Sequence, residues 1–119
     1  MARVLVVDDV LFMRTLIGNA LSAAGHQVVG EASDGVEAVE RFMELRPELT
    51  TLDITMPNKD GLAALAEILS IDPSARVIVC SAVSQQSKVL ESIRLGARDF
   101  VLKPVEPARL LHAVDEALK

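Results

Sequence analysis

The chain has 119 residues, which suits a single domain with one core and leaves no room for two. Half of the residues are apolar and 24% are charged, a composition typical of globular proteins, and no apolar run is long enough to cross a bilayer. The net charge of −5 and the absence of tryptophan and tyrosine argue against binding of nucleic acid, anionic membranes or flavins through bulk charge or ring stacking.

The first apolar run, Arg3–Val7, predicts a buried strand. Two aspartates, Asp8 and Asp9, follow it directly. The residues before the strand lack the long apolar stretch and the small-residue cleavage site of a secretory signal. We therefore expect a cytoplasmic protein.

Four more short apolar runs follow, separated by segments that carry apolar residues three and four positions apart. This alternation is typical of parallel strands joined by helices. Gly25 and Gly96 can take the left-handed conformation at helix ends, while Pro47 and Pro73 prevent continuation of the helices before them. The remaining predicted strands are Val28–Ala32, Leu49–Asp53, Val77–Ser81 and Phe100–Lys103, and a last helix starts near Pro107.

Each predicted helix offers one apolar stripe to a sheet, as the second does with Val36, Val39, Phe42 and Met43. Five strand–helix pairs in so short a chain suit an open, doubly wound sheet, because a closed eight-fold barrel needs about twice as many residues. We therefore predict an α/β fold of the flavodoxin-like kind. It has five parallel strands in the order 2-1-3-4-5 and five helices.

Polar residues stand at the strand ends, where such folds hold their functional crevice. Asp8 and Asp9 follow the first strand, Asp53 ends the third, Ser81 the fourth and Lys103 the fifth. Three carboxylates brought together repel one another, so they tend to take up protons or a cation. Magnesium fits best, because it takes carboxylate oxygens and leaves positions for phosphate oxygens. One cysteine and two separated histidines leave no ligand set for zinc.

The same edge has the groups that a phosphoryl group needs: the Ser81 hydroxyl as a donor and Lys103 as a point charge. The chain has no Gly-x-x-x-x-Gly-Lys loop for a nucleotide and no histidine at the strand ends. The central Asp53 is then the candidate phosphoryl acceptor, while Asp8 and Asp9 are placed to hold metal. Taken alone, each aspartate is more simply interpreted as a helix N-cap. Capping, however, does not require this set of five residues.

Four motifs occur together in the chain: Val4–Asp9 with Phe12–Arg14, Asp53–Pro57 with Gly61, Ser81–Ala82, and Lys103–Pro104. In combination they resemble the receiver domain of two-component response regulators, and the resemblance covers residues 1–119 as a single domain. It implies phosphorylation of Asp53 by a histidine kinase, with Mg²⁺ as the cofactor. Asp9 and Asp53 would bind the ion directly, Asp8 through water, and Thr55 through its backbone carbonyl.

The resemblance also implies a switch. Ser81 and Lys103 would contact the phosphoryl group, and in this family their movement is coupled to an aromatic residue on the fifth strand, here Phe100. Tyrosine is frequent at that position, so Phe100 keeps the steric part of the switch without a hydroxyl. Thr55 and Val83 occupy positions that tune the phosphoryl lifetime by guiding or blocking water. Apolar Val83 cannot orient water, so we expect slow self-dephosphorylation.

Within this family, the chain resembles the stand-alone regulators of chemotaxis. They imply a CheA-like histidine kinase as donor, a flagellar motor switch protein as target, and output through the face of the fourth helix, fifth strand and fifth helix. We expect a monomer that is not an enzyme in the usual sense, because it would catalyse only its own phosphoryl transfer and dephosphorylation. We expect neither a nucleic acid nor a membrane to be a binding partner.

Other interpretations remain open at this point. A receiver domain from a longer regulator or a stand-alone phosphorelay intermediate would have the same motifs, although the end of the chain directly after the fifth helix favours a stand-alone messenger. A metal-dependent phosphohydrolase could use Asp53 as nucleophile, but such enzymes usually place a second acid where Thr55 stands. A flavin-binding protein of the same fold conflicts with Asp8 and Asp9 at the position of a phosphate loop.

Overall fold

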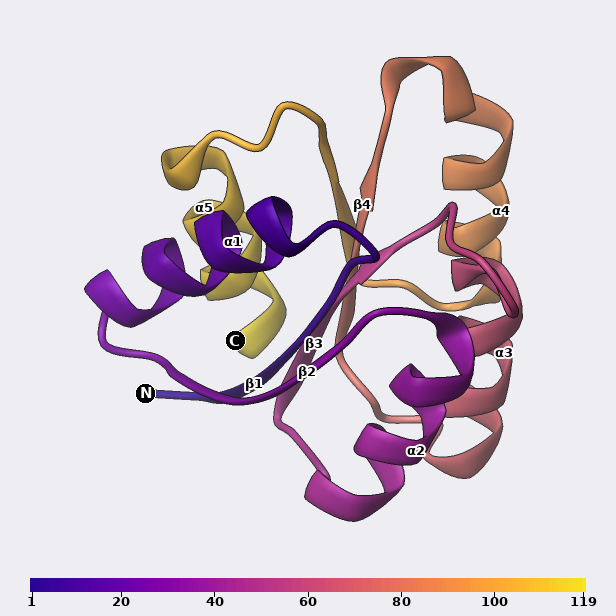
Figure 1. Cartoon of the computed structure of the whole chain (residues 1–119), viewed down its shortest axis with the longest axis horizontal. Coiled ribbons are helices and arrows are strands. Elements are labelled where there is room, and N and C mark those ends of the chain that lie inside the picture. Colours follow the sequence, from indigo (N-terminus) through magenta and orange to yellow (C-terminus); the bar gives the residue numbers. More distant parts are fainter.

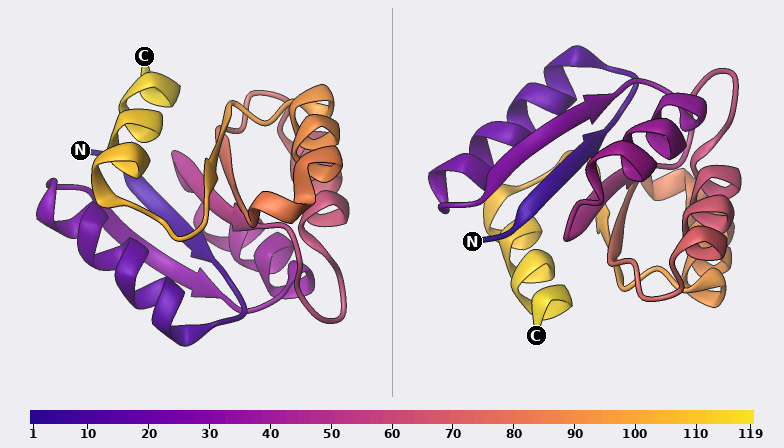
Figure 2. Two further views of the ribbon diagram at one scale, coloured as in Figure 1. Left: turned by 90° about the horizontal axis from the view of Figure 1, so that it is seen from above. Right: turned by 90° about the horizontal axis from the view of Figure 1, so that it is seen from below.

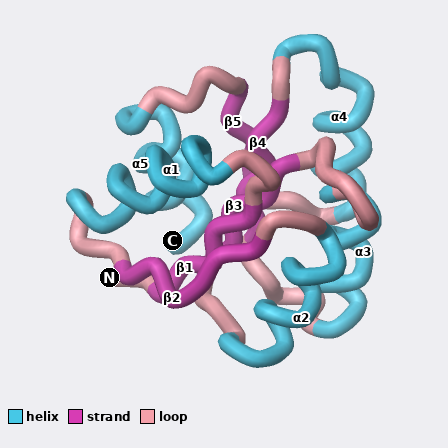
Figure 3. The backbone as a smooth tube through the Cα atoms, in the orientation of Figure 1, coloured by secondary structure: helices cyan, strands magenta, loops and turns pink.

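The computed structural model describes residues 1–119 and contains one parallel sheet at the centre of the molecule (Figures 1 and 3). The strand order is β2-β1-β3-β4-β5, so the predicted order 2-1-3-4-5 is confirmed. Consecutive strands are all joined by crossovers that contain helices. The strands are β1 (Arg3–Val7), β2 (Gln27–Ala32), β3 (Leu49–Asp53), β4 (Val77–Ser81) and β5 (Asp99–Leu102).

Five helices cover the two faces of the sheet. Helices α1 and α5 lie side by side on one face, and α2, α3 and α4 lie in a row on the other (Figures 1 and 2). None of these helices is long and apolar enough to span a bilayer. The helices are α1 (Leu11–Ala23), α2 (Gly35–Leu45), α3 (Gly61–Ile71), α4 (Gln86–Leu95) and α5 (Pro107–Leu118), with a single 3-10 turn, Val83–Gln85, before α4.

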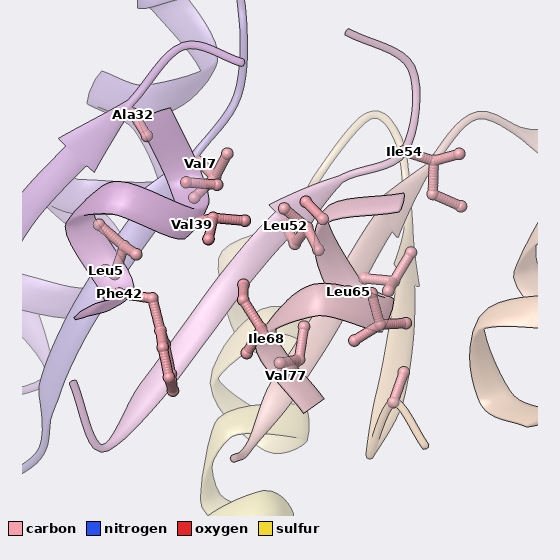
Figure 4. Packing of buried hydrophobic residues seen from close by; sticks show 14 of the residues in the cluster. Leu5, Val7, Ala32, Val39, Phe42, Leu52, Ile54, Leu65, Ile68 and Val77 are labelled. Atoms are coloured by element: carbon pink, nitrogen blue, oxygen red, sulfur yellow. The ribbon is translucent and has the colours of Figure 1, made fainter. Parts of the chain in front are cut away.

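The chain is one domain, but its sheet divides the buried side chains into two cores, one on each face, so the expectation of one core is wrong. Along β1, Leu5 and Val7 point to the α2–α3–α4 face and Val4 and Val6 to the α1–α5 face, so the strand is apolar from Val4 to Val7. Phe42 is the largest fully buried side chain of the core on the α2–α3–α4 face. Figure 4 shows part of that core, with Leu52, Leu65, Ile68 and Val77 in the space between the sheet and the helices.

The helix ends follow the expected chemistry in most places. Gly25, two residues after the end of α1, has a φ of 89°, and Gly96, directly after α4, has a φ of 123°. At the end of α2, Arg46 takes the left-handed conformation just before Pro47. Asp34 caps the start of α2 by accepting a hydrogen bond from the Glu37 N–H.

Two sequence predictions about the elements are wrong in detail. Strand β5 is displaced by one residue from the predicted range and ends at Leu102; Lys103 donates its N–H to the Ser81 carbonyl at 2.8 Å, but Pro104 has no N–H with which to continue. The predicted stripe of α2 is also displaced. Val36 and Met43 are 43% and 49% exposed, because the face toward the core is centred on Ala38, Val39 and Phe42.

Candidate functional site

Three side chains meet at the carboxyl edge of the sheet, on the α1–α5 face. Asp8 lies two residues beyond Val6 and Lys103 two beyond Val101, and both of these valines belong to the α1–α5 core. The alternation of side chains along a strand therefore aims Asp8 and Lys103 to the same side as Asp53. Lys103 Nζ lies 3.0 Å from Asp8 Oδ2 and 3.1 Å from Asp53 Oδ1.

The third carboxylate of the cluster belongs to Asp9. Asp8 is fully buried and Asp53 is 4% exposed, whereas Asp9 faces solvent. One carboxylate oxygen from each of the three aspartates lies within 4.8 Å of the others. The donors are all hard oxygens and one side of the cluster is open, which fits a magnesium ion that keeps part of its water shell.

The charges in this cluster do not balance. Burial raises the pKa of Asp53 to about 6, and the nearby Asp8 carboxylate adds to the increase, while the Lys103 ammonium opposes it. For Lys103, burial works against the charged form, but the ion pairs with Asp8 and Asp53 outweigh it and raise the pKa. Three aspartates around one ammonium leave excess negative charge at neutral pH, and a bound cation would neutralise it.

Asp8 is held in place from several sides, but it does not cap a helix. Its Oδ1 accepts a hydrogen bond from the Val10 N–H at 2.9 Å, and its backbone carbonyl accepts one from Arg14 Nη1 at 2.8 Å. The N-cap of α1 is Val10 and that of α3 is Asp60, so no cluster aspartate occupies an N-cap position. The capping interpretation of these residues is therefore wrong.

The loop after β3 approaches Asp53 closely. The Gly61 N–H donates to the Ile54 carbonyl at 2.7 Å, and a Cβ atom at Gly61 would overlap the main-chain carbonyl of Asp53. Asn58, at a φ of 67°, donates from Nδ2 to Asp34 Oδ2 at 2.7 Å and so ties the loop to the start of α2. Only a residue without a Cβ fits at position 61 in this arrangement.

Ser81 ends β4 as expected, but its hydroxyl is engaged elsewhere. Ser81 Oγ lies 3.1 Å from Gln85 Oε1 and 3.1 Å from the Ala82 carbonyl, and it makes no hydrogen bond to Asp53. The Gln85 side chain also accepts from the Ala82 N–H at 3.2 Å and donates from Nε2 to Thr55 Oγ1. Sequence reasoning missed Gln85, because a polar residue at the start of a helix carries no distinguishing pattern.

Two other residues singled out in the sequence lie outside the carboxylate cluster. Phe100 is half-buried on β5 and packs against the α2–α3–α4 core. It also lines a hollow of about 320 Å³ together with Val89, Leu90 and Ile93 of α4 and Leu102 of β5. Val83 stands 57% exposed on the turn before α4.

Comparison with known proteins yields one consistent family. Residues 4–115 match the model of the response regulator receiver domain. The chemotaxis protein CheY of Listeria monocytogenes is 50% identical over 119 residues, covering 100% of both chains. CheY of Thermotoga maritima is 49% identical over 117 residues, covering 98% of both.

Solved structures agree with this result. The chain is similar to a chain in the CheX–CheY–BeF₃–Mg complex from Borrelia burgdorferi, with a TM-score of 0.94 and 34% sequence identity. The match covers 98% of this chain and 89% of the chain in the complex. The response regulator domain of Thermotoga maritima CheB gives a TM-score of 0.91 and 38% identity, with 98% and 95% covered. The family match, the sheet order and these relatives together show that the chain belongs to the response regulator receiver domain family.

Proposed function

We propose that this receiver domain is a phosphorylation-activated switch in which Asp53 accepts a phosphoryl group from a CheA-like histidine kinase. The observation that carries the proposal is the position of Lys103, whose ammonium lies within 3.1 Å of both Asp8 and Asp53 beside the exposed Asp9. A nucleophilic carboxylate, a fixed cation and an open cluster of oxygen ligands are the parts that phosphoryl transfer to aspartate requires.

In the reaction, a carboxylate oxygen of Asp53 attacks the phosphorus atom of a phosphohistidine. The P–N bond breaks, its electron pair stays on the imidazole nitrogen, and an acyl phosphate forms on Asp53. The Asp53 carboxyl must be ionised to attack, and with a pKa of about 6 it is mostly ionised at neutral pH. Lys103, freed in part from its ion pair, would then contact a phosphoryl oxygen together with the Ser81 hydroxyl.

The cluster fits the magnesium ion that receiver domains bind. Asp9 and Asp53 would hold the ion directly, Asp8 through a water molecule, and Thr55 through its backbone carbonyl. The fit depends on the convergence of three carboxylates and on the burial of two of them, which leaves negative charge that one lysine does not neutralise. When bound, Mg²⁺ offsets the charge on the carboxylates and on the incoming phosphoryl oxygens.

The output of the switch is proposed to be the face formed by α4, β5 and α5. Apolar side chains are exposed there, with Leu90 at 59%, Ile93 at 41% and Leu102 at 42%, beside the half-buried Phe100. Phosphorylation would change the position of Phe100 and with it the affinity of this face for a partner. Because full-length relatives are CheY proteins of chemotaxis, we propose a flagellar motor switch protein as that partner.

The first experiment is intact-mass spectrometry after incubation with acetyl phosphate, with and without Mg²⁺. We expect wild type to gain one phosphoryl group only when the metal is present, and Asp53→Asn to gain none. Asp115→Asn, on the exposed side of α5, is the matched control and should behave as wild type. If no adduct forms from acetyl phosphate or from a phosphorylated kinase, the proposal is wrong.

A second experiment tests the output. Binding of the motor switch protein is measured by titration calorimetry with the free chain and with the chain that carries beryllofluoride and Mg²⁺ as a phosphoryl mimic. We expect tighter binding with the mimic, and loss of that gain in Leu90→Ser. Glu40→Ser, an exposed residue of α2 on a different part of the surface, should retain it. Equal affinity with and without the mimic would mean that the target is another protein.

A further inference from the structure

Gln85 connects three segments at the carboxyl edge of the sheet. It lies on the turn between β4 and α4, and its backbone N–H donates to the Ala82 carbonyl at 3.1 Å. Its side-chain oxygen accepts from Ser81 Oγ and from the Ala82 N–H, while its amide nitrogen donates to Thr55 Oγ1 in the loop after β3. One glutamine thus binds the last residue of β4 and the residue two positions after Asp53.

The amide of Gln85 has only one orientation that satisfies these partners. The Ala82 N–H is a donor and requires an acceptor, so the carbonyl oxygen must face it and the NH₂ group must face Thr55. The same carbonyl oxygen is then presented to the Ser81 hydroxyl from a fixed direction. Ser81 has a single hydroxyl hydrogen, which it gives to Gln85 or to the Ala82 carbonyl.

A phosphoryl group on Asp53 makes a competing demand on that hydrogen. For Ser81 to donate to a phosphoryl oxygen, its hydroxyl must leave the Gln85 carbonyl oxygen. We propose that Gln85 is a positioning residue that holds the Ser81 hydroxyl in its resting orientation and so weakens the affinity of the site for a phosphoryl group. This inference rests on the proposed function, because it assumes that Ser81 contacts the phosphoryl group.

The alternative is that Gln85 only supports the turn before α4. A purely structural residue would change the stability of the fold, but its effect on phosphoryl binding would not depend on the Ser81 hydroxyl. The two possibilities are therefore separated by a double-mutant cycle of Gln85 and Ser81.

The test measures the affinity for beryllofluoride in saturating Mg²⁺ by titration calorimetry. Gln85→Met keeps the length of the side chain and removes its polar atoms, so we expect binding to tighten about three- to tenfold, the range that one net hydrogen bond supplies. In the Ser81→Ala background, the same substitution should change the affinity less than about twofold. Gln86→Met, on the adjacent exposed glutamine, is the control and should match wild type.

Each outcome is decisive. Unchanged or weaker binding by Gln85→Met, or equal tightening with and without the Ser81 hydroxyl, overturns the inference while the proposed function stands. If neither wild type nor Gln85→Met binds beryllofluoride, the proposed function fails and the inference with it. Gln85→Ala is measured in parallel, with the circular dichroism melting curve of each variant, so that a defect in folding is recognised.

Discussion

Lys103 and Asp53 form an ion pair of 3.1 Å although strand β4 lies between the strands that carry them. The long lysine side chain reaches across β4 from the end of β5, and it is 24% exposed. The same ammonium lies 3.0 Å from Asp8. A single cation therefore bridges two buried carboxylates and offsets their mutual repulsion, and the stability of the cluster depends on it.

Lys103→Met should destabilise the protein in a pH-dependent manner. Without the ammonium, Asp8 and Asp53 are buried without a counter-charge, and we expect a loss of about 2 kcal/mol in the free energy of unfolding at about pH 7.5 without metal. The loss should shrink at about pH 5, where Asp53 takes up a proton. Urea unfolding at both pH values measures it, with the exposed Lys88→Met as control. An equal loss at both pH values would show that the lysine acts through packing alone.

Asp53→Asn should stabilise the metal-free protein. The pKa of Asp53 in the folded state, about 6, lies above its ordinary value of 3.8, so the folded chain binds more protons between these values. The free energy of unfolding of wild type then falls as the pH rises from about 4 to about 6, and it stays reduced above that range. Removing the charge should restore roughly 2 kcal/mol at about pH 7.5 and almost nothing at about pH 4.

Thermal melting at the two pH values, without Mg²⁺, measures this difference. Asp115→Asn should leave the melting temperature of the protein unchanged at both. Saturating Mg²⁺ should raise the melting temperature of wild type more than that of Asp53→Asn, because the variant lacks one of the carboxylates that we propose to bind the ion. A variant less stable than wild type at about pH 7.5 would mean that the ion pair with Lys103 outweighs the burial of the Asp53 carboxylate and its repulsion from Asp8.

The sequence pattern was sufficient for the fold. Strands buried on both faces, such as β1 and β4, are apolar at four of their five positions, and helices between consecutive strands favour a parallel arrangement. The errors were local. Val36 and Met43 are apolar but exposed, because the spacing of apolar residues identifies a stripe without fixing its centre when small residues such as Ala38 share the buried face.

The candidate site could be predicted in part for the same geometric reason. Residues at the carboxyl ends of parallel strands share one edge, so the approach of Asp8, Asp53 and Lys103 follows from the strand order and the alternation of side chains along each strand. The direction of the Ser81 hydroxyl does not follow, because it depends on the turn that places Gln85 opposite it. Strand periodicity contains no information about such a contact between a turn and a strand end.

Gly61→Ala and Gly18→Ala should have opposite effects on stability. A Cβ at Gly61 would overlap the Asp53 carbonyl and lie 2.7 Å from Ile54 Cα, so the backbone must move, at a cost of about 2 kcal/mol. A Cβ at Gly18 meets only Val28 Cγ2 at 3.8 Å within α1, and alanine there should add about 0.5 to 1 kcal/mol. Urea unfolding of both variants measures the contrast. A Gly61→Ala variant as stable as wild type would show that the loop after β3 adjusts without strain.

If Asp53 accepts a phosphoryl group as proposed, Val83→Glu should shorten the lifetime of that group. The valine is exposed on the turn before α4, two residues after Ser81, and its side chain can neither accept a proton from water nor orient it. A carboxylate there could do both, and we expect the phosphoryl group to be lost roughly tenfold faster. This is less than the rate increase that a well-positioned general base supplies. The rate is measured by intact mass after acetyl phosphate is removed, and Val83→Gln separates orientation from proton acceptance. An unchanged rate in Val83→Glu would show that this position does not control water at the site.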